Sequence, residues 1–186
     1  MEINSLKDFE SIDWSDYIVG NVYIASNLGE LYPKRIWCSG SLYVGGDTVI
    51  ETDGYISVGG GITSWERLSA MQFIDAARFI KAKSIYSGDG IKAGTEIHVE
   101  DGIRARRSIE AGGHIESNAG IVAETGGITA GSYIDAKYAI SAASRVIAGV
   151  GAWHDGVNLF SQIRCAIIKC SSHIGELIQE NPDELA

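Results

Sequence analysis

The sequence of 186 residues is poor in proline and cysteine, with two and three residues respectively, and it contains no long apolar run. Proline is excluded from strand interiors, so its scarcity is compatible with a chain built largely of strands. No stretch of about eighteen apolar residues is present, so we predict no membrane-spanning helix and no membrane partner. The acidic N-terminus lacks a basic region followed by an apolar stretch, so we expect no secretory signal. An odd number of cysteines then favours reduced thiols and a cytoplasmic location.

The sequence also lacks the motifs that carry common chemistries. It has no nucleophile elbow, P-loop or dinucleotide-binding fingerprint. Cys165, Cys170 and His173 match a zinc-ligand spacing only loosely, and strand periodicity predicts that both sulfurs point inward. His98 and His114 occupy different phases of the repeat described below, so they need not share a face. We therefore predict no catalytic residue, no metal site and no cofactor.

What the sequence does contain is a phrase, Ile-x-small, that returns about every six residues from Ile56 to Ala148. Side chains two apart on a strand face the same way, so each phrase describes a short strand with one buried face. A helix fits poorly, because a period of six drifts against 3.6 residues per turn. The leading positions are Ile56, Ile62, Leu68, Ile74, Ile80, Ile85, Ile91, Ile97, Ile103, Ile109, Ile115, Ile121, Ile128, Ile134, Ile140 and Val146.

A repeat of six residues cannot bury its own isoleucine, but stacking copies on one another does so. The pattern therefore predicts an all-β fold, a β-solenoid with glycine-rich corners and a capping segment at each end. Coils of twelve residues and triangular coils of eighteen both fit the spacing. The repeat is one residue short between Ile80 and Ile85 and one residue long between Ile121 and Ile128, and we expect corners to absorb both slips.

Residues 65–83 read as an amphipathic helix when taken alone. The repeat nevertheless continues through them with Leu68, Ile74 and Ile80 in place, so we predict strands here. A helical insert over residues 64–73 is the alternative.

The chain divides into three parts by sequence. Residues 1–17 form an acidic cap that contains a short amphipathic helix, and residues 18–178 form the solenoid. A glycine-flanked break at 149–156, containing Trp153 and His154, interrupts the repeat, which Ile174 and its neighbours restore. Residues 179–186 form a polar tail. Cys38, Cys165 and Cys170 take the small inward position and are expected to be buried thiols.

The net charge of −9 is concentrated at the two ends of the chain. Residues 1–31 carry six acids and one base, and residues 151–186 carry five acids and two bases. The intervening part is close to neutral, with thirteen acids and twelve bases. An acidic rod that imitates nucleic acid would spread its charge along the stack, whereas here the charge lies mainly at the ends. Direct binding of nucleic acid is not expected either.

Aromatic residues occupy outward positions near the N-terminus, where later repeats carry charge. We predict a ladder of Tyr23, Trp37 and Tyr43 that forms a candidate interface. The acidic residues of the cap border it, and they are Asp8, Glu10, Asp13 and Asp16. The alternative is that residues 1–17 only cover the first coil, whose edge would otherwise be exposed.

Residues 80–148 carry a characteristic repeat pattern, with motifs such as IEAGG within IKAGTEIHVEDGIRARRSIEAGGHIES. It resembles the β-solenoid repeats of bactofilins and of polymer-forming flagellar-assembly proteins. The resemblance implies a non-catalytic solenoid that self-associates or acts as a scaffold. Bactofilins usually carry flexible, basic, proline-containing tails, whereas this chain has acidic capped ends, an arrangement that does not favour end-to-end polymerisation.

Three functions follow as hypotheses. The first is a non-catalytic interaction or scaffold protein that binds a protein partner or itself. The second is an acidic phage-type inhibitor of a nucleic-acid-binding protein. The third is a hexapeptide-repeat acyltransferase, in which His98 or His114 would act. In that enzyme class, however, the small residue usually precedes the aliphatic one, and here it follows.

Overall fold

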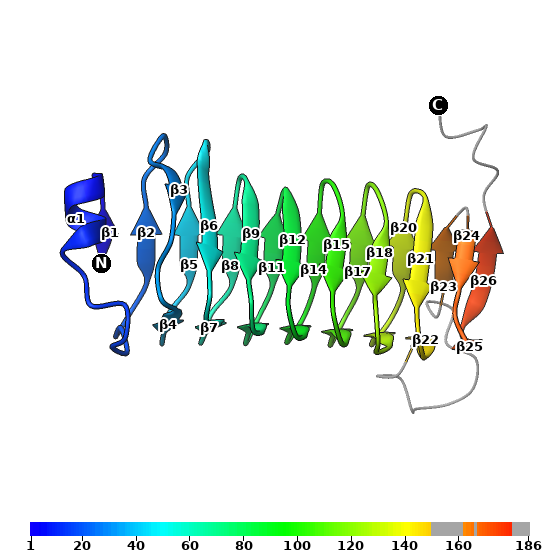
Figure 1. Ribbon diagram of the computed structural model, residues 1–186. Coiled ribbons are helices and arrows are strands. Elements are labelled where there is room, and N and C mark those ends of the chain that lie inside the picture. The colour runs from blue at the N-terminus through cyan, green and yellow to red at the C-terminus, as the bar shows by residue number, and fades with distance from the viewer. Residues whose placement is uncertain (150–161, 166, 180–186) are drawn as a thin grey trace.

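The computed structural model describes residues 1–149, 162–165 and 167–179 (Figure 1). Apart from one short helix, α1 (Leu6–Glu10), its regular elements are strands, which form three parallel sheets of a β-solenoid. Among these described residues, no helix has the length and apolar character needed to cross a membrane. The β-solenoid predicted from the repeat is therefore confirmed.

The strands of the three sheets follow one another along the solenoid axis, and each coil contributes one strand to each sheet. Sheet A contains β1 (Glu2–Ile3), β2 (Val22–Ile24), β5 (Leu42–Val44), β8 (Ile62–Ser64), β11 (Ile80–Ala82), β14 (Ile97–Val99), β17 (Ile115–Ser117), β20 (Ile134–Ala136), β23 (Gln162–Cys165) and β26 (Glu176–Gln179). Sheet B contains β4 (Ile36–Cys38), β7 (Ile56–Val58), β10 (Ile74–Ala76), β13 (Ile91–Ala93), β16 (Ile109–Ala111), β19 (Ile128–Ala130), β22 (Arg145–Ala148) and β25 (Ser172–Ile174). Sheet C contains β3 (Gly29–Leu31), β6 (Thr48–Thr52), β9 (Arg67–Ala70), β12 (Ser84–Ser87), β15 (Ile103–Ala105), β18 (Ile121–Ala123), β21 (Ala139–Ala142) and β24 (Ile167–Lys169).

The register shows that the coils are triangular. Ile91 lies opposite Ile109 and Ile109 opposite Ile128, 18 and 19 residues apart. Other coils take 17 residues, as from Ile74 to Ile91, or 20, as from Ile36 to Ile56. The twelve-residue coil that the spacing also allowed is excluded. Isoleucine stacks on isoleucine along the interior of every sheet, which removes these side chains from water and provides the main stabilisation.

Corners absorb the two slips in the repeat, as predicted. Ile80, Ile85, Ile121 and Ile128 are all buried, so neither the missing nor the extra residue turns an isoleucine outward. Serine replaces alanine at some inward positions and finds a corner carbonyl there: the Ser87 hydroxyl donates to the Gln72 carbonyl at 2.6 Å. Such a hydrogen bond offsets the cost of burying the hydroxyl.

The ambiguous segment 65–83 is strand. It provides β9, β10 and β11, whose leading residues Leu68, Ile74 and Ile80 are fully buried. The helical alternative for residues 64–73 is therefore wrong, because stacking on both neighbouring coils outweighs the local helical pattern.

The N-terminal segment covers the first coil (Figure 1). β1 pairs in parallel with β2 and extends sheet A, while Ile3 and Trp14 are buried against the core. The Trp14 ring packs against Phe9 with centroids 4.9 Å apart. Ser5 caps α1, its side chain accepting a hydrogen bond from the Asp8 amide.

The C-terminal coil departs from the predicted register. His173 lies opposite Val146 and Ile174 opposite Ile147, because the chain takes three residue steps from Lys169 to Ser172 but four between their partners, Ser141 and Arg145. Ile174 therefore faces outward and is 56% exposed, so its predicted inward position is wrong. Cys38 and Cys165 are buried and Cys170 is half-buried. Beyond Gly149, the break at 149–156 with Trp153 and His154 lies outside the described residues, as do 180–186 of the tail.

Candidate functional site

Two of the three predicted aromatic residues form a pair on sheet A. Tyr23 in β2 lies opposite Tyr43 in β5, and their rings stack with centroids 4.8 Å apart and an interplanar angle of 4°. The Asn21 side-chain amide donates to the Tyr23 hydroxyl at 3.0 Å and restrains that ring. Both rings remain substantially exposed.

Trp37 does not join this ladder. It belongs to β4 in sheet B, a different side of the triangular coil, so the prediction of one ladder for all three residues is wrong. Its ring packs against Tyr17 with centroids 4.6 Å apart, and the Arg35 guanidinium lies 5.8 Å from its centroid. The sequence did not single out Tyr17 or Arg35, because only the fold brings them beside Trp37.

The four acidic residues of the predicted interface divide into two kinds. Asp8 accepts a hydrogen bond from the Asn4 amide at 3.1 Å and helps to cap α1. Asp13 accepts one from the Ser15 amide at 2.9 Å, and its pKa is lowered by the hydrogen bonds from Ser15 and, to a smaller extent, by the positive charges of Lys34 and Arg35. Asp8 and Asp13 thus stabilise the cap itself. Glu10 and Asp16 are exposed.

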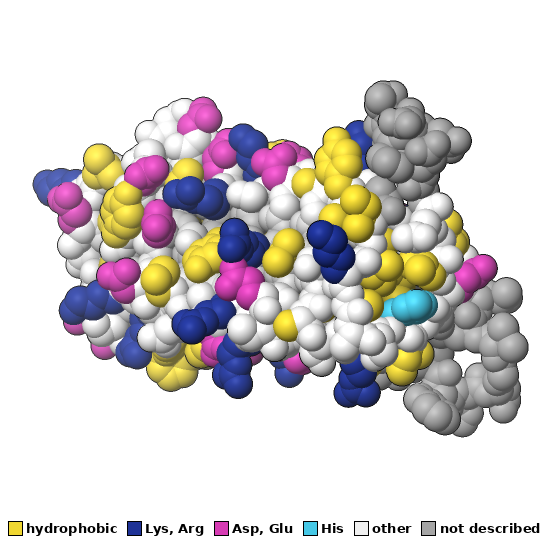
Figure 2. Space-filling view, turned by 45° about the vertical axis from the view of Figure 1, so that its right-hand side comes forward, with side chains coloured by type: hydrophobic (Ala, Val, Ile, Leu, Met, Phe, Trp, Pro, Cys, Tyr) yellow, Lys and Arg dark blue, Asp and Glu magenta, His cyan; other side chains and the backbone are white. Residues whose placement is uncertain are grey.

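Exposed hydrophobic side chains concentrate in the N-terminal coils. Of the thirteen large ones among the described residues, ten lie between residues 1 and 71, and the next along the chain is Tyr138. Besides the residues already named, the ten include Tyr32, Trp65 and Met71, which the repeat pattern did not indicate because they lie in or beside corners rather than at outward strand positions. Figure 2 shows charged side chains of both signs interspersed over the middle of the face in view. Among the described residues, exposed large hydrophobic side chains are therefore most numerous in the N-terminal coils.

A polar cluster lies farther along sheet A, where the strands carry ionisable residues. The His98 Nδ1 atom is 2.7 Å from Glu116 Oε2, and the Tyr133 hydroxyl hydrogen-bonds the other oxygen of the same carboxylate. The His114 ring stacks on Tyr133 with centroids 4.8 Å apart, and its Nε2 atom is 3.5 Å from Glu96. The triangular coil places both histidines near one edge of sheet A, which the differing phases of the repeat did not predict.

The electrostatics of this cluster favour a structural role. Partial burial raises the pKa of Glu116, but hydrogen bonds from Tyr133 and His98 and the charges of His114 and His98 outweigh it, and the net shift is downward. Burial, followed by the hydrogen bond to Glu116, raises the pKa of Tyr133 well above its ordinary value. A phenol held in its protonated form is a poor nucleophile or base. The Tyr133 hydroxyl next to the His98–Glu116 pair therefore acts as a hydrogen-bond donor to Glu116.

The lowered pKa of Glu116 predicts a specific acid sensitivity. A carboxyl group whose pKa is depressed by folding contributes stability above its unfolded value, and that contribution is lost as the pH falls through the folded value. We expect the parent to be more stable than Glu116→Gln at pH 7, and the difference to shrink progressively as the pH falls below about 4.5. Urea unfolding at several pH values measures it. Glu110→Gln, at an exposed position on sheet B, is the control, and a Glu116→Gln difference that persisted undiminished at low pH would contradict the expectation.

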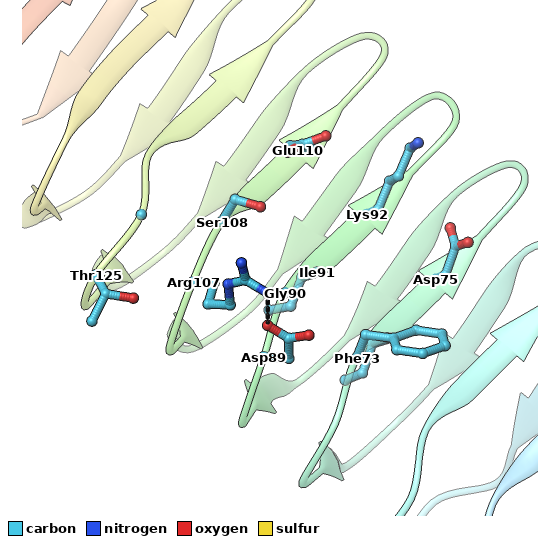
Figure 3. Close-up of a pocket in the computed structure, with 12 residues that line it drawn as sticks. Phe73, Asp75, Asp89, Gly90, Ile91, Lys92, Arg107, Ser108, Glu110 and Thr125 are labelled. Atoms are coloured by element: carbon cyan, nitrogen blue, oxygen red, sulfur yellow. Dashed lines mark hydrogen bonds and ion pairs between the residues drawn. The ribbon is translucent and has the colours of Figure 1, made fainter.

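An open groove of about 610 Å³ crosses β10, β13 and β16 of sheet B, the corners that precede them and the corner before β19 (Figure 3). Its lining combines the Phe73 ring and the backbone of Gly90 with charged side chains. Asp89 and Arg107 point toward one another at its rim, with Arg107 Nη1 3.3 Å from Asp89 Oδ1. No residue of this groove was among the predicted site residues, because the groove is assembled from several successive coils.

The described residues contain no group of three His, Cys, Asp or Glu side chains arranged to hold a metal ion. Burial raises the pKa of the Cys38 thiol, whereas a reactive cysteine has a lowered one.

Comparison of the chain with family models, with curated proteins and with solved structures found no match.

Proposed function

We propose that this protein is a non-catalytic interaction module, a rigid solenoid that binds a protein partner or a second copy of itself through its N-terminal coils. The observation that carries the proposal is the concentration of exposed aromatic and aliphatic side chains between residues 1 and 71. Clustered exposed apolar groups mark interaction surfaces in water-soluble proteins, and tyrosine and tryptophan anchor such surfaces.

The Tyr23–Tyr43 pair is a stacked part of this surface. The two side chains stack in register on adjacent strands, so their rotamers are already restricted before a partner arrives. Ordering a side chain on binding costs about 0.5–1.5 kcal/mol, and prior stacking reduces that cost. The pair therefore suits a lateral contact on the flat face of sheet A.

The N-terminal cap favours such a lateral contact over end-to-end assembly. β1 occupies the edge of sheet A, and Ile3 and Trp14 fill the first rung of the core. A deletion of residues 1–16 would remove both side chains and expose the core, so it does not isolate the interface. Substitution at the sheet surface is the cleaner test.

We expect the double variant Tyr23→Ala/Tyr43→Ala to lose association at least tenfold while it remains folded, because two central aromatic anchors are worth about 1.4 kcal/mol or more together. Self-association is measured by size-exclusion light scattering, and partner binding by quantitative affinity capture from the native host. Tyr86→Ala, at a half-exposed outward position on sheet C, is the matched control. Unchanged association of the double variant at unchanged melting temperature would place the interface elsewhere.

The salt dependence of the same association separates this proposal from the acidic-inhibitor hypothesis. Exposed charges are screened beyond about 10 Å at 0.1 M salt, so binding led by Glu10 and Asp16 would weaken steeply with ionic strength. Binding led by Tyr23 and Tyr43 is expected to change little between 0.05 and about 0.5 M salt.

A further inference from the structure

Each strand of sheet B is preceded by a corner residue, and these residues stack along the axis because the coils are in register. Ile56 donates its amide proton to the Phe73 carbonyl at 3.0 Å, and Ile74 does the same to the Gly90 carbonyl at 3.0 Å. Each bond joins the residue after one corner to the corner residue of the next coil, so the corner residues of successive coils lie next to one another. In order from the N-terminal end, the corner residues are Arg35, Tyr55, Phe73, Gly90 and Ser108.

The first three corner residues form a continuous stack. The Arg35 guanidinium lies 5.6 Å from the centroid of Tyr55, and the Tyr55 and Phe73 rings are parallel within 8° with centroids 4.8 Å apart. That spacing equals the usual separation of hydrogen-bonded strands, so the solenoid sets the distance between rings.

The stack stops at Gly90. Glycine supplies no side chain for the next step, and both Phe73 and Gly90 line the groove of about 610 Å³. The space beside Phe73, where Gly90 has no side chain, therefore has the position and spacing of one further ring. Figure 3 shows this position with Phe73 on one side and the Asp89–Arg107 pair at its rim.

The charged side chains beside the space at Gly90 determine which kind of aromatic ligand fits there. Asp75, Lys92 and Glu110 lie opposite one another on successive strands of sheet B, with the lysine between two carboxylates. Arg107 is engaged by Asp89, so carboxylates outnumber free cationic groups in the lining. The excess of one negative charge favours a basic group over a phosphate next to the ring.

We propose that the groove binds an aromatic side chain of a protein partner, flanked in sequence by basic residues. The ring stacks on the open face of Phe73 in the place that Gly90 leaves vacant, and the flanking cations approach Asp75 and Glu110. The inference rests on the proposed interaction function only in that the occupant is a protein, and it concerns a side of the solenoid other than that of Tyr23 and Tyr43.

The probe is the tripeptide acetyl-Lys-Trp-Lys-amide, titrated into the full-length ¹⁵N-labelled protein and followed by the amide signals of Gly90 and Gly126. We expect saturable shifts at these glycines. Replacement of the ring in acetyl-Lys-Leu-Lys-amide and reversal of charge in acetyl-Glu-Trp-Glu-amide should each weaken binding at least about fivefold, as expected when a stacked ring or an opposite charge is lost. Equal binding of either control peptide overturns the proposal, and so does tighter binding of adenosine 5′-monophosphate, which would indicate a nucleotide site.

Two variants test the position of the ring. A Cβ atom at Gly90 would lie 3.3 Å from the Ser108 carbonyl oxygen, so Gly90→Phe requires the Ser108 backbone to move by a few tenths of an ångström, and the Gly90 backbone is not in the left-handed region. The new ring would fill the position beside Phe73. We expect Gly90→Phe to remain folded and to abolish tripeptide binding. Gly102→Phe is the matched control, because Gly102 precedes a strand of sheet C and its Cβ would lie 3.5 Å from the Gly120 carbonyl oxygen. Binding by Gly90→Phe equal to that of Gly102→Phe overturns the proposal.

Phe73→Leu keeps an apolar side chain but removes the platform, so we expect it to weaken tripeptide binding at least about fivefold while the protein remains folded. Parent-like affinity in this variant overturns the stacking geometry. The Tyr23→Ala/Tyr43→Ala variant should bind the tripeptide like the parent. Failure of the tripeptide to bind overturns the proposal for the groove and leaves the Tyr23–Tyr43 interface untouched. Retained partner association in the double variant overturns the Tyr23–Tyr43 interface and leaves the groove untouched.

Discussion

Ile109→Asp should prevent the protein from folding. Ile109 is fully buried between Ile91 and Ile128 in the interior ladder of sheet B. The substitution removes a large aliphatic side chain and places a carboxyl group where neither water nor a partner reaches it. The combined cost exceeds about 5 kcal/mol, which is comparable to the whole stability of many domains. Circular dichroism and size-exclusion chromatography of the purified variant measure the loss of the native state.

The adjacent residue provides the control for this prediction. Glu110 points outward from the same strand, so Glu110→Ala should change the free energy of unfolding by no more than about 0.5 kcal/mol. If Ile109→Asp melted within a few degrees of Glu110→Ala, the inward register of β16 would be wrong.

Gly112→Ala should be clearly destabilising, although it adds only one methyl group. The corner after each strand of sheet B stacks closely on its neighbours, and a Cβ at Gly112 would overlap the backbone carbonyl oxygen of Gly94. A backbone atom cannot move aside as a flexible side chain does, so two coils must shift apart. We expect a loss of about 1–3 kcal/mol, the usual range for overpacking, measured by urea unfolding.

Gly102→Ala is the matched substitution at a corner with room. Its Cβ would lie 3.5 Å from the Gly120 carbonyl oxygen, an ordinary van der Waals distance. We expect a change within about 0.5 kcal/mol of the parent. Equal destabilisation by the two alanines would mean that the general conformational preference of glycine, rather than close coil stacking, decides both sites.

These corners also explain why the glycines differ in function. Gly112 permits close stacking of the backbone, whereas Gly90 leaves a gap in a column of rings. The sequence alone does not distinguish these two kinds of glycine. The difference depends on the direction in which each Cβ would point relative to the next coil.

The sequence by itself determined the fold class and the identity of the buried residues. Ile-x-small repeated every six residues leaves one buried face per strand, and stacking is the only way for such short strands to bury it. The same pattern correctly made strands of residues 65–83. Its prediction for Ile174 was wrong because the step from Lys169 to Ser172 is one residue shorter than the step between their partners, Ser141 and Arg145, and the repeat alone does not show which positions of successive coils are paired.

Only the tertiary structure decided which outward residues meet. Outward positions have no partner until the number of residues per coil is known, and spacing alone allowed twelve or eighteen. A triangular coil puts Tyr23 beside Tyr43 but Trp37 on another side, and it brings His98 to Glu116 and Tyr133 from three separate coils. The same geometry aligns Tyr55, Phe73 and Gly90 into a column with a vacant step. Burial is a property of each short strand and can be read locally, whereas a surface site on a solenoid is assembled across coils and depends on their register.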